Sequence, residues 1–424
     1  MSGAPLVAGA RRLGPAFDLI ANYEPDGFFF ERSGLGVSAS GTAGGFDVNG
    51  GPGRIEELAR VAGETLGAIQ RDDDGPPVVA VGAIPFDEAE PASLAIPSRT
   101  AVRRRTGDTW RIDVWPQDGA PGETEPPGRW VGGAPHQAFA DIQVRPDPEP
   151  SRYAAAVGEA TRRIAAGELR KIVLARSLIV EAGRELDPHR LLWRLRAVDP
   201  DCFAFAVPTF APEGRRLASR GVLVGASPEL LVRKAGAEVR ATPLAGSAPR
   251  FGDPEEDRAS AERLLGSEKD REEHAAVSEF VELVLGNFCG RLDHPEEPEL
   301  LGTANVWHLA TPFHGRLRDP ARSVLDLVAE LHPTPAVCGA PRDGARKVLG
   351  ELETLHRGCY AGPVGWVDVN GDGEWAIGLR CAEVAGSTAR LFAGAGIVAG
   401  SVPGLELDET ERKFRALLDS LRWG

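Results

Sequence analysis

Glu273 lies on the apolar face of a predicted helix, where a carboxylate lowers stability unless its charge is neutralised. It shares one face of a predicted helix with four apolar residues at helical spacing, Val277, Phe280, Val281 and Val284. A carboxylate on a buried face is costly unless it is paired with a cation or bound to a metal ion. The pattern therefore indicates either a buried salt bridge to an arginine or a metal ligand.

The C-terminal segment carries further carboxylates and a cation. Glu406 and Glu409 precede an apolar set at helical spacing, and Glu409 and Lys413 form an i,i+4 pair. An exposed pair of this kind contributes only about 0.3–0.5 kcal/mol. The residues alone leave open either a solvated ion pair or a place in a binding site.

Arg380 and a run of glycines suit an anionic ligand. Arg380 falls within a predicted strand, where placing a charged guanidinium costs free energy. Bidentate hydrogen bonding to a carboxylate best explains an arginine at this position. Gly394, Gly396 and Gly400 let backbone amides come close to a ligand. No Lys-Ser/Thr follows them, so the phosphate-loop pattern fails and we expect a carboxylate ligand.

Glu229 and His308 have ordinary explanations when each is taken alone. Glu229 follows Ser-Pro at the entrance to an apolar strand, which suits a solvated carboxylate as well as a buried acid. His308 lies between Trp and Leu and suits a core histidine that is satisfied by hydrogen bonds. Neither residue indicates a function without its neighbours.

Several segments, taken in order, resemble the chorismate-utilising enzymes, which include the isochorismate, salicylate, anthranilate and aminodeoxychorismate synthases. The segments are Ser-Pro-Glu at 227–229, PLAGSAPR at 243–250, SEKDREEH at 267–274, HLAT at 308–311, LHPTPAVCG at 331–339, YAGPVGW at 360–366 and AGAGIV at 393–398. The resemblance is dense over residues 150–420 and looser before them. One such match would be weak evidence, whereas the set in this order is strong.

The resemblance implies a role for each residue of the site. The implied metal ligands, for Mg²⁺, are Glu273, Glu409 and, nearby, Glu406. The implied substrate-binding residues are Ala245, Gly246, Ser247, His308, Tyr360, Arg380, Gly394, Gly396 and Lys413. Among these, Arg380, Tyr360 and the glycine amides would hold a substrate carboxylate, and His308 would contact a substrate hydroxyl.

Lys171 and Ala245 distinguish between members of the family. Water-using members carry a general-base lysine at the strand position of Lys171, which the anthranilate synthases typically lack. Aminodeoxychorismate synthases place a nucleophilic lysine where this chain has Ala245. The resemblance therefore implies an isochorismate synthase serving siderophore or menaquinone biosynthesis. A salicylate synthase, which also eliminates pyruvate, and an aminating subunit of an amidotransferase complex are the alternatives.

The implied reaction divides proton transfer between Lys171 and Glu229. Lys171 would remove a proton from the water that adds at C2 of chorismate, and Glu229 would protonate the departing C4 hydroxyl. The pKa of a free lysine, about 10.4, lies about three units above neutral pH. We therefore predict that burial or nearby positive charge lowers the pKa of Lys171.

Composition excludes several classes of protein. The net charge of −14 argues against binding to nucleic acid or to an anionic membrane surface. Five scattered cysteines without CxxC spacing argue against a disulfide framework or a zinc site. With no signal-peptide pattern and no apolar run of membrane-spanning length, we expect a cytoplasmic monomer or weak homodimer whose partner is the small molecule chorismate.

The elements that must position these residues interleave without regular βαβ alternation, so the pattern alone predicts an α+β protein. Expected strands are 171–180, 203–208, 221–225, 229–233, 363–369, 374–384 and 390–398, and expected helices are 254–288, broken near 266, and 408–422. The resemblance implies one large domain over 1–424, an aminodeoxychorismate-synthase-like fold of packed antiparallel β-sheets flanked by helices. Residues 1–145 would be its looser part and 150–420 its catalytic core.

Overall fold

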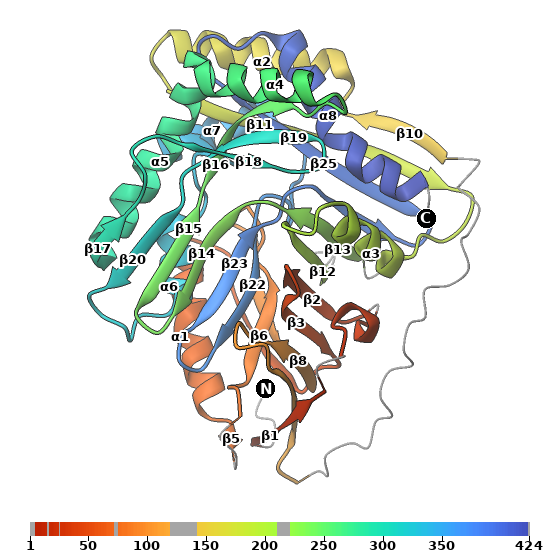
Figure 1. Ribbon diagram of the computed structural model, residues 1–424, viewed down its shortest axis with the longest axis vertical. Helices are drawn as coiled ribbons and strands as arrows, with labels where there is room; N and C mark the ends of the chain where they lie inside the picture. Colours follow the sequence, from red (N-terminus) through yellow and green to blue (C-terminus); the bar gives the residue numbers. More distant parts are fainter. Residues whose placement is uncertain are drawn as a thin grey trace.

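The computed structural model describes residues 5–14, 17–24, 26–71, 75–118, 142–209 and 221–422. Within these ranges the strands form three sheets, and helices cover them from outside (Figure 1). The α+β class and the packed antiparallel sheets expected from the sequence are confirmed.

The first sheet has 13 strands. They are β1 (Leu6–Leu13), β2 (Phe28–Arg32), β3 (Leu35–Ser40), β5 (Gln70–Arg71), β8 (Arg99–Arg103), β9 (Thr109–Pro116), β10 (Ile142–Asp147), β11 (Lys171–Ala182), β12 (Phe203–Thr209), β13 (Gly221–Ser227), β21 (Gly339–Ala340), β24 (Cys381–Ala385) and β25 (Thr388–Ile397). Their order is β10-β11-β25-β24-β13-β12-β2-β3-β8-β9-β1-β5, and β21 pairs with β11.

The second sheet has nine strands and the third has three. The second contains β4 (Gly44–Val48), β6 (Val79–Ala83), β7 (Ala92–Ile96), β14 (Leu230–Ala235), β15 (Glu238–Thr242), β17 (Cys289–Asp293), β20 (Phe313–Leu317), β22 (Pro363–Asp368) and β23 (Gly373–Ile377). Its order is β17-β20-β15-β14-β23-β22-β6-β7-β4. The third consists of β16 (Leu244–Pro249), β19 (Val306–Ala310) and β18 (Glu299–Gly302), in that order.

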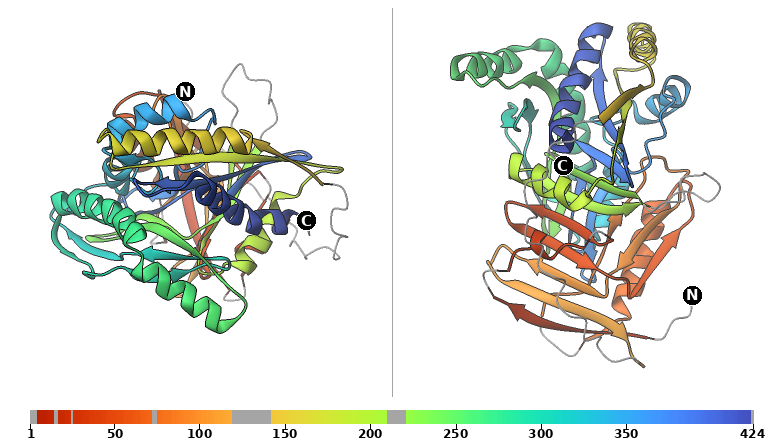
Figure 2. Two further views of the ribbon diagram at one scale, coloured as in Figure 1. Left: turned by 90° about the horizontal axis from the view of Figure 1, so that it is seen from above. Right: turned by 90° about the vertical axis from the view of Figure 1, so that its right-hand side faces the viewer.

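Most of the helices gather at one end of the molecule, at the top of Figure 1. The helices are α1 (Arg54–Gly67), α2 (Pro150–Ala165), α3 (Pro188–Val198), α4 (Pro254–Gly266), α5 (Glu268–Phe288), α6 (Val324–Leu331), α7 (Arg342–Leu352), α8 (Pro403–Arg422) and the 3-10 helix η1 (Ile20–Asn22). Figure 2 shows α2 and α8 at the same end, where they pack on each other and on β11 and β25. None of the described helices is long and apolar enough to cross a membrane.

The break expected near residue 266 is confirmed, and it separates α4 from α5. Ser267 has extended backbone there, and its hydroxyl accepts a hydrogen bond from the backbone N–H of Asp270. Because a serine cap satisfies a free amide of the first turn, it starts a new helix at Glu268. This new helix carries Glu273 in its second turn.

Residues 5–118 contribute strands to both large sheets. β2 pairs with β12, and β6 pairs with β22, so the strands of this region extend one end of each large sheet. The first third of the chain is therefore built into the same sheets that carry the later motifs.

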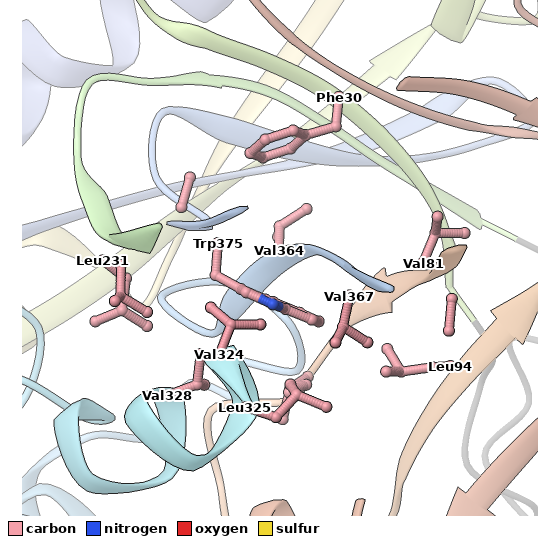
Figure 3. Packing of buried hydrophobic residues seen from close by; sticks show 14 of the residues in the cluster. Phe30, Val81, Leu94, Leu231, Val324, Leu325, Val328, Val364, Val367 and Trp375 are labelled. Atoms are coloured by element: carbon pink, nitrogen blue, oxygen red, sulfur yellow. The ribbon is translucent and has the colours of Figure 1, made fainter. Parts of the chain in front are cut away.

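Trp375 of β23 is fully buried on the face of the second sheet that α6 covers. Val324 and Val328 of α6 and Val364 and Val367 of β22 surround its indole ring (Figure 3). A buried tryptophan removes more apolar surface from water than any other side chain, so this contact fixes α6 against the second sheet.

The prediction of one strand over 374–384 is wrong in its middle. β23 ends at Ile377 in the second sheet and β24 begins at Cys381 in the first, so the chain changes sheets between them. In the connection Gly378 donates to the carbonyl of Gly362, and Arg380 has a φ of 48°. Arg380 therefore occupies a turn in the left-handed region, a strained conformation for a non-glycine residue.

We predict that Trp375→Ala lowers the free energy of unfolding by about 3–5 kcal/mol, because it leaves a large cavity in a rigid part of the core. Urea unfolding followed by far-ultraviolet circular dichroism measures this. Leu283→Ala, at a position that is 69% exposed, is the matched control and should change stability by no more than about 0.5 kcal/mol. Equal effects of the two substitutions would contradict this account of the core.

Candidate active site

A cavity of about 80 Å³ lies among β11, β25, β16, β19, α5 and α8. Most of the residues singled out from the sequence line it. They are Glu229, Ala245, Gly246, Ser247, Glu273, His308, Tyr360, Arg380, Gly394, Gly396, Glu409 and Lys413. Lys171 and Glu406 are not part of this lining, but each lies beside a residue that is.

Glu229 precedes β14 and is a buried acid. The residue is 2% exposed, and its carboxyl oxygen Oε1 has no hydrogen-bond partner among the described residues. Burial raises its pKa to about 8, although Lys171 and a hydrogen bond from the Leu244 amide oppose this shift. At neutral pH Glu229 is therefore protonated and can donate a proton.

Lys171, the first residue of β11, forms an ion pair with Glu273. Its Nζ lies 3.0 Å from Oε1 of Glu273, and the two side chains are 1% and 13% exposed. A Cβ at residue 396 would lie 2.0 Å from that same oxygen and 3.1 Å from Cε of Lys171, so only Gly396 leaves room for the pair. The cation that neutralises Glu273 is thus a lysine, where the sequence favoured an arginine or a metal ion.

Two further lysine–glutamate pairs lie where α8 meets α5 and β25. Nζ of Lys413 lies 2.6 Å from Oε1 of Glu409 and also donates to the carbonyl of Gly394 at 2.9 Å. Burial alone would raise the pKa of Glu409, but Lys413 outweighs it and the pKa falls below its ordinary value. Glu406, which is 1% exposed, accepts a hydrogen bond from Lys269 at 2.7 Å.

Ser247, His308 and Arg380 form a hydrogen-bonded row. Nε2 of His308 accepts from Arg380 at 3.0 Å, so Nδ1 carries the proton and faces Oγ of Ser247 at 3.2 Å. Burial, reinforced by Arg380, holds the pKa of His308 well below its ordinary range. A neutral histidine with a fixed tautomer therefore orients the guanidinium of Arg380.

Tyr360 lies flat against the wall that β25 forms. Its ring stacks on Phe392 with the centroids 4.9 Å apart, and a Cβ at Gly394 would lie 3.1 Å from its hydroxyl oxygen. Burial raises the pKa of the Tyr360 hydroxyl. The group therefore stays neutral and available to donate a hydrogen bond.

The carboxylates of α5 and α8 have the chemistry of a magnesium site. Within the described ranges, no three His, Cys, Asp or Glu side chains converge in a preformed metal site. Glu273 and Glu409 nevertheless line one cavity, and burial together with neighbouring carboxylates raises the pKa of Asp270 and of Glu406. Carboxylate oxygens are hard donors of the kind that Mg²⁺ binds, and Mg²⁺ takes its remaining ligands from water and substrate.

Comparison with known proteins matches this arrangement to one family. A family model described as chorismate binding enzyme matches residues 133–422. The chain belongs to the chorismate binding enzyme family.

Relatives within the family are similar over nearly the whole chain. Isochorismate synthase DhbC of Bacillus subtilis is 38% identical, covering 95% of each chain, and isochorismate synthase EntC of Escherichia coli K12 is 36% identical, covering 94% of this chain and 96% of its own. The crystal structure of a putative 2,3-dihydroxybenzoate-specific isochorismate synthase, DhbC from Bacillus anthracis, superposes with a TM-score of 0.81 at 35% identity. It covers 96% of this chain and 99% of its own.

One charged residue that lines this cavity was not predicted from the sequence. Arg357 is buried and lines the cavity, as do the apolar residues Val337 and Phe392. The available signal was the i,i+4 spacing of Glu353 and Arg357 just before Tyr360, which alone is typical of an exposed pair.

We predict that the raised pKa of Glu229 is visible in the pH dependence of stability. Between about pH 5 and pH 8 the unfolded chain ionises this carboxyl, whose ordinary pKa is 4.5, while the folded chain keeps it protonated. The folded state then binds more protons, so wild-type stability falls relative to Glu229→Gln as pH rises, by about 1.4 kcal/mol per pH unit.

Urea unfolding at several pH values measures this difference. Glu262→Gln, at an exposed position, is the control, and its free energy of unfolding should change with pH in the same way as that of the wild type. If the difference in free energy of unfolding between the wild type and Glu229→Gln stayed constant with pH, Glu229 would have the same pKa in the folded and unfolded states.

Proposed function

We propose that the chain is an isochorismate synthase that converts chorismate to isochorismate. The observation that carries this proposal is the buried, unpartnered carboxyl oxygen of Glu229 in a cavity wall that also holds Glu273, the partner of Lys171. Both B. subtilis DhbC and E. coli EntC bear the name of this activity.

The reaction adds water at C2 of chorismate, shifts the ring double bonds and expels the C4 hydroxyl, so one water enters and one leaves. Lys171 serves as the base in its neutral form, which requires that it first lose the proton with which it pairs to Glu273, and it then accepts a proton from the attacking water. Glu229 gives its proton to the departing hydroxyl. The cycle is completed when Lys171 releases its proton to solvent and Glu229 takes up a new proton. Two groups with opposite protonation requirements can work at one pH because their surroundings differ.

Three groups suit the carboxylates of the substrate. Arg380 offers a guanidinium that neutral His308 holds in place, and Tyr360 offers a neutral hydroxyl. An arginine fork matches a carboxylate with two parallel hydrogen bonds. Lys413, tied to Glu409 and to the carbonyl of Gly394, adds positive charge nearby.

Mg²⁺ is the cofactor that fits the remaining carboxylates. Glu273 and Glu409 would hold it, with Glu406 close by, and it would neutralise a substrate carboxylate next to them. Each of the three carboxylates contacts a lysine, Glu273 through Lys171, Glu409 through Lys413 and Glu406 through Lys269, so a metal ion would have to share or displace these contacts.

We further propose that the enzyme works in the cytoplasm as a monomer or weak homodimer. All five cysteines are free, as is usual in a reducing compartment. The siderophore and menaquinone pathways would both accept its product.

The test is to incubate the purified protein with chorismate and Mg²⁺, without ammonia, and to identify the products by chromatography. We expect isochorismate, with turnover abolished by EDTA and restored by added Mg²⁺. Lys171→Ala and Glu229→Gln should each fold normally and lose at least about 100-fold in turnover.

Other outcomes would assign other functions. Salicylate together with pyruvate would make the chain a salicylate synthase. Turnover only with ammonia or an added amidotransferase would make it an aminating subunit. Normal turnover by Lys171→Ala would overturn the role of Lys171 as the base.

A further inference from the structure

Strand β11 lacks a strand partner along part of one edge. There β21 pairs with Lys171 and Ile172, and β10 pairs with residues 177–182. Among the described strands, none pairs with residues 173–176 on that edge, although the backbone N–H of Val173 donates to the carbonyl of Cys338 at 2.8 Å. The gap starts two residues after Lys171, and Val173 within it lines the cavity.

Two side chains from the segment after α7 fill this gap. Oε2 of Glu353 accepts a hydrogen bond from the backbone N–H of Ala175 at 2.9 Å, and Nη2 of Arg357 donates to the carbonyl of Val173 at 2.8 Å. The two side chains bind each other through Nε–Oε1 at 2.6 Å and Nη2–Oε2 at 2.8 Å. Together they supply the donor and the acceptor that a neighbouring strand would supply.

Arg357 also joins β11 to two other parts of the cavity wall. Its Nη1 donates to the carbonyl of Val337 at 2.7 Å. Its guanidinium carbon lies 4.3 Å from the ring centroid of Phe86 and 5.9 Å from that of Tyr360. Since the guanidinium donors form a rigid planar fork, one group sets the spacing between β11, residues 336–337 and Tyr360.

Stability alone does not account for this ion pair. The side chains of Arg357 and Glu353 are only 4% and 7% exposed. The desolvation of a buried ion pair often cancels its attraction, and well-packed apolar residues serve as well. Positioning is a task that apolar residues cannot perform, because they cannot bind backbone groups at fixed distances.

We propose that the Glu353–Arg357 pair positions the catalytic groups by substituting for the absent strand along residues 173–176. It holds Val173, and with it the Lys171 end of β11, at a fixed spacing from the rest of the cavity. Arg357 is thus a positioning residue that acts through β11 and Tyr360. The proposal rests on the proposed function, which gives Lys171 its task.

The experiment compares full-length Glu353→Gln and Arg357→Lys with the wild type in kcat, KM for chorismate and melting temperature. We expect kcat to fall about 10- to 100-fold in both variants, because small displacements of reacting groups are costly, while KM changes less than about threefold. Lysine keeps the charge opposite Glu353 but cannot reach both carbonyls. A purely structural ion pair would therefore be rescued in Arg357→Lys.

Glu31→Gln is the matched control. It breaks the pair between Glu31, which is 2% exposed, and Arg196, at 2.5 Å, away from the cavity lining. It should lower the melting temperature and leave kcat unchanged. Unchanged kcat in both test variants would overturn the proposal, and so would a raised KM at constant kcat, which would mean direct substrate binding by Arg357.

Amide hydrogen exchange tests the same idea without turnover. In Glu353→Gln the amide of Ala175, which donates to Glu353, should exchange faster than in the wild type. The amide of Val173, which donates to the carbonyl of Cys338, and those of residues 179–181, held between β10 and β25, should stay protected. Equal exchange would overturn the proposal. A wild type that does not convert chorismate would instead refute the proposed function, and the exchange result would still decide whether the pair replaces a strand.

Discussion

The desolvation of Glu229 is the constraint on which the rest of the site depends. Its carboxyl sits at the entrance to β14 with one oxygen unpartnered among the described residues, and burial keeps it protonated at neutral pH. Such a group destabilises the fold whenever it is ionised. The Leu244 amide and Lys171 offset only part of this effect, so the site keeps a proton ready to donate.

The remaining charges are arranged so that each carboxylate has its own cation. Lys171 pairs with Glu273, Lys269 with Glu406, and Lys413 with Glu409. These pairs connect β11, α5 and α8, which are far apart in the sequence. The antiparallel register that places Val173 opposite Gly396 brings β11 and β25 together and leaves the space in which the first pair forms.

Residue types and local motifs predicted much of this site, and long-range geometry supplied the rest. The apolar face of α5 was enough to show that Glu273 needs a counter-charge, and the break in this helical region was predicted near Gly266, just before the residue Ser267 that caps α5. The partner of Glu273 was not predictable, because Lys171 is distant in sequence and meets it only through sheet packing. The roles that the family resemblance gives to individual residues remain predictions.

The strand that was wrongly predicted and the residues that were missed also depend on long-range geometry. The alternating pattern over 374–384 reads as one strand because it does not reveal that β23 and β24 belong to different sheets. Arg380 consequently lies in a turn with positive φ, from which it reaches His308. The spacing of Glu353 and Arg357 gave no sign that they complete the edge of β11, since only the sheet order shows that this edge is open.

The most direct test of this account is the infrared difference spectrum of the wild type against Glu229→Gln, followed as a function of pH. The account predicts a protonated carboxyl band at neutral pH that is absent from the variant and disappears with a midpoint near pH 8, the pKa of about 8 that burial gives Glu229. A spectrum in which this carboxyl is already ionised at neutral pH would contradict the assignment of Glu229 as the acid, and with it the proposed sharing of proton transfer between Glu229 and Lys171.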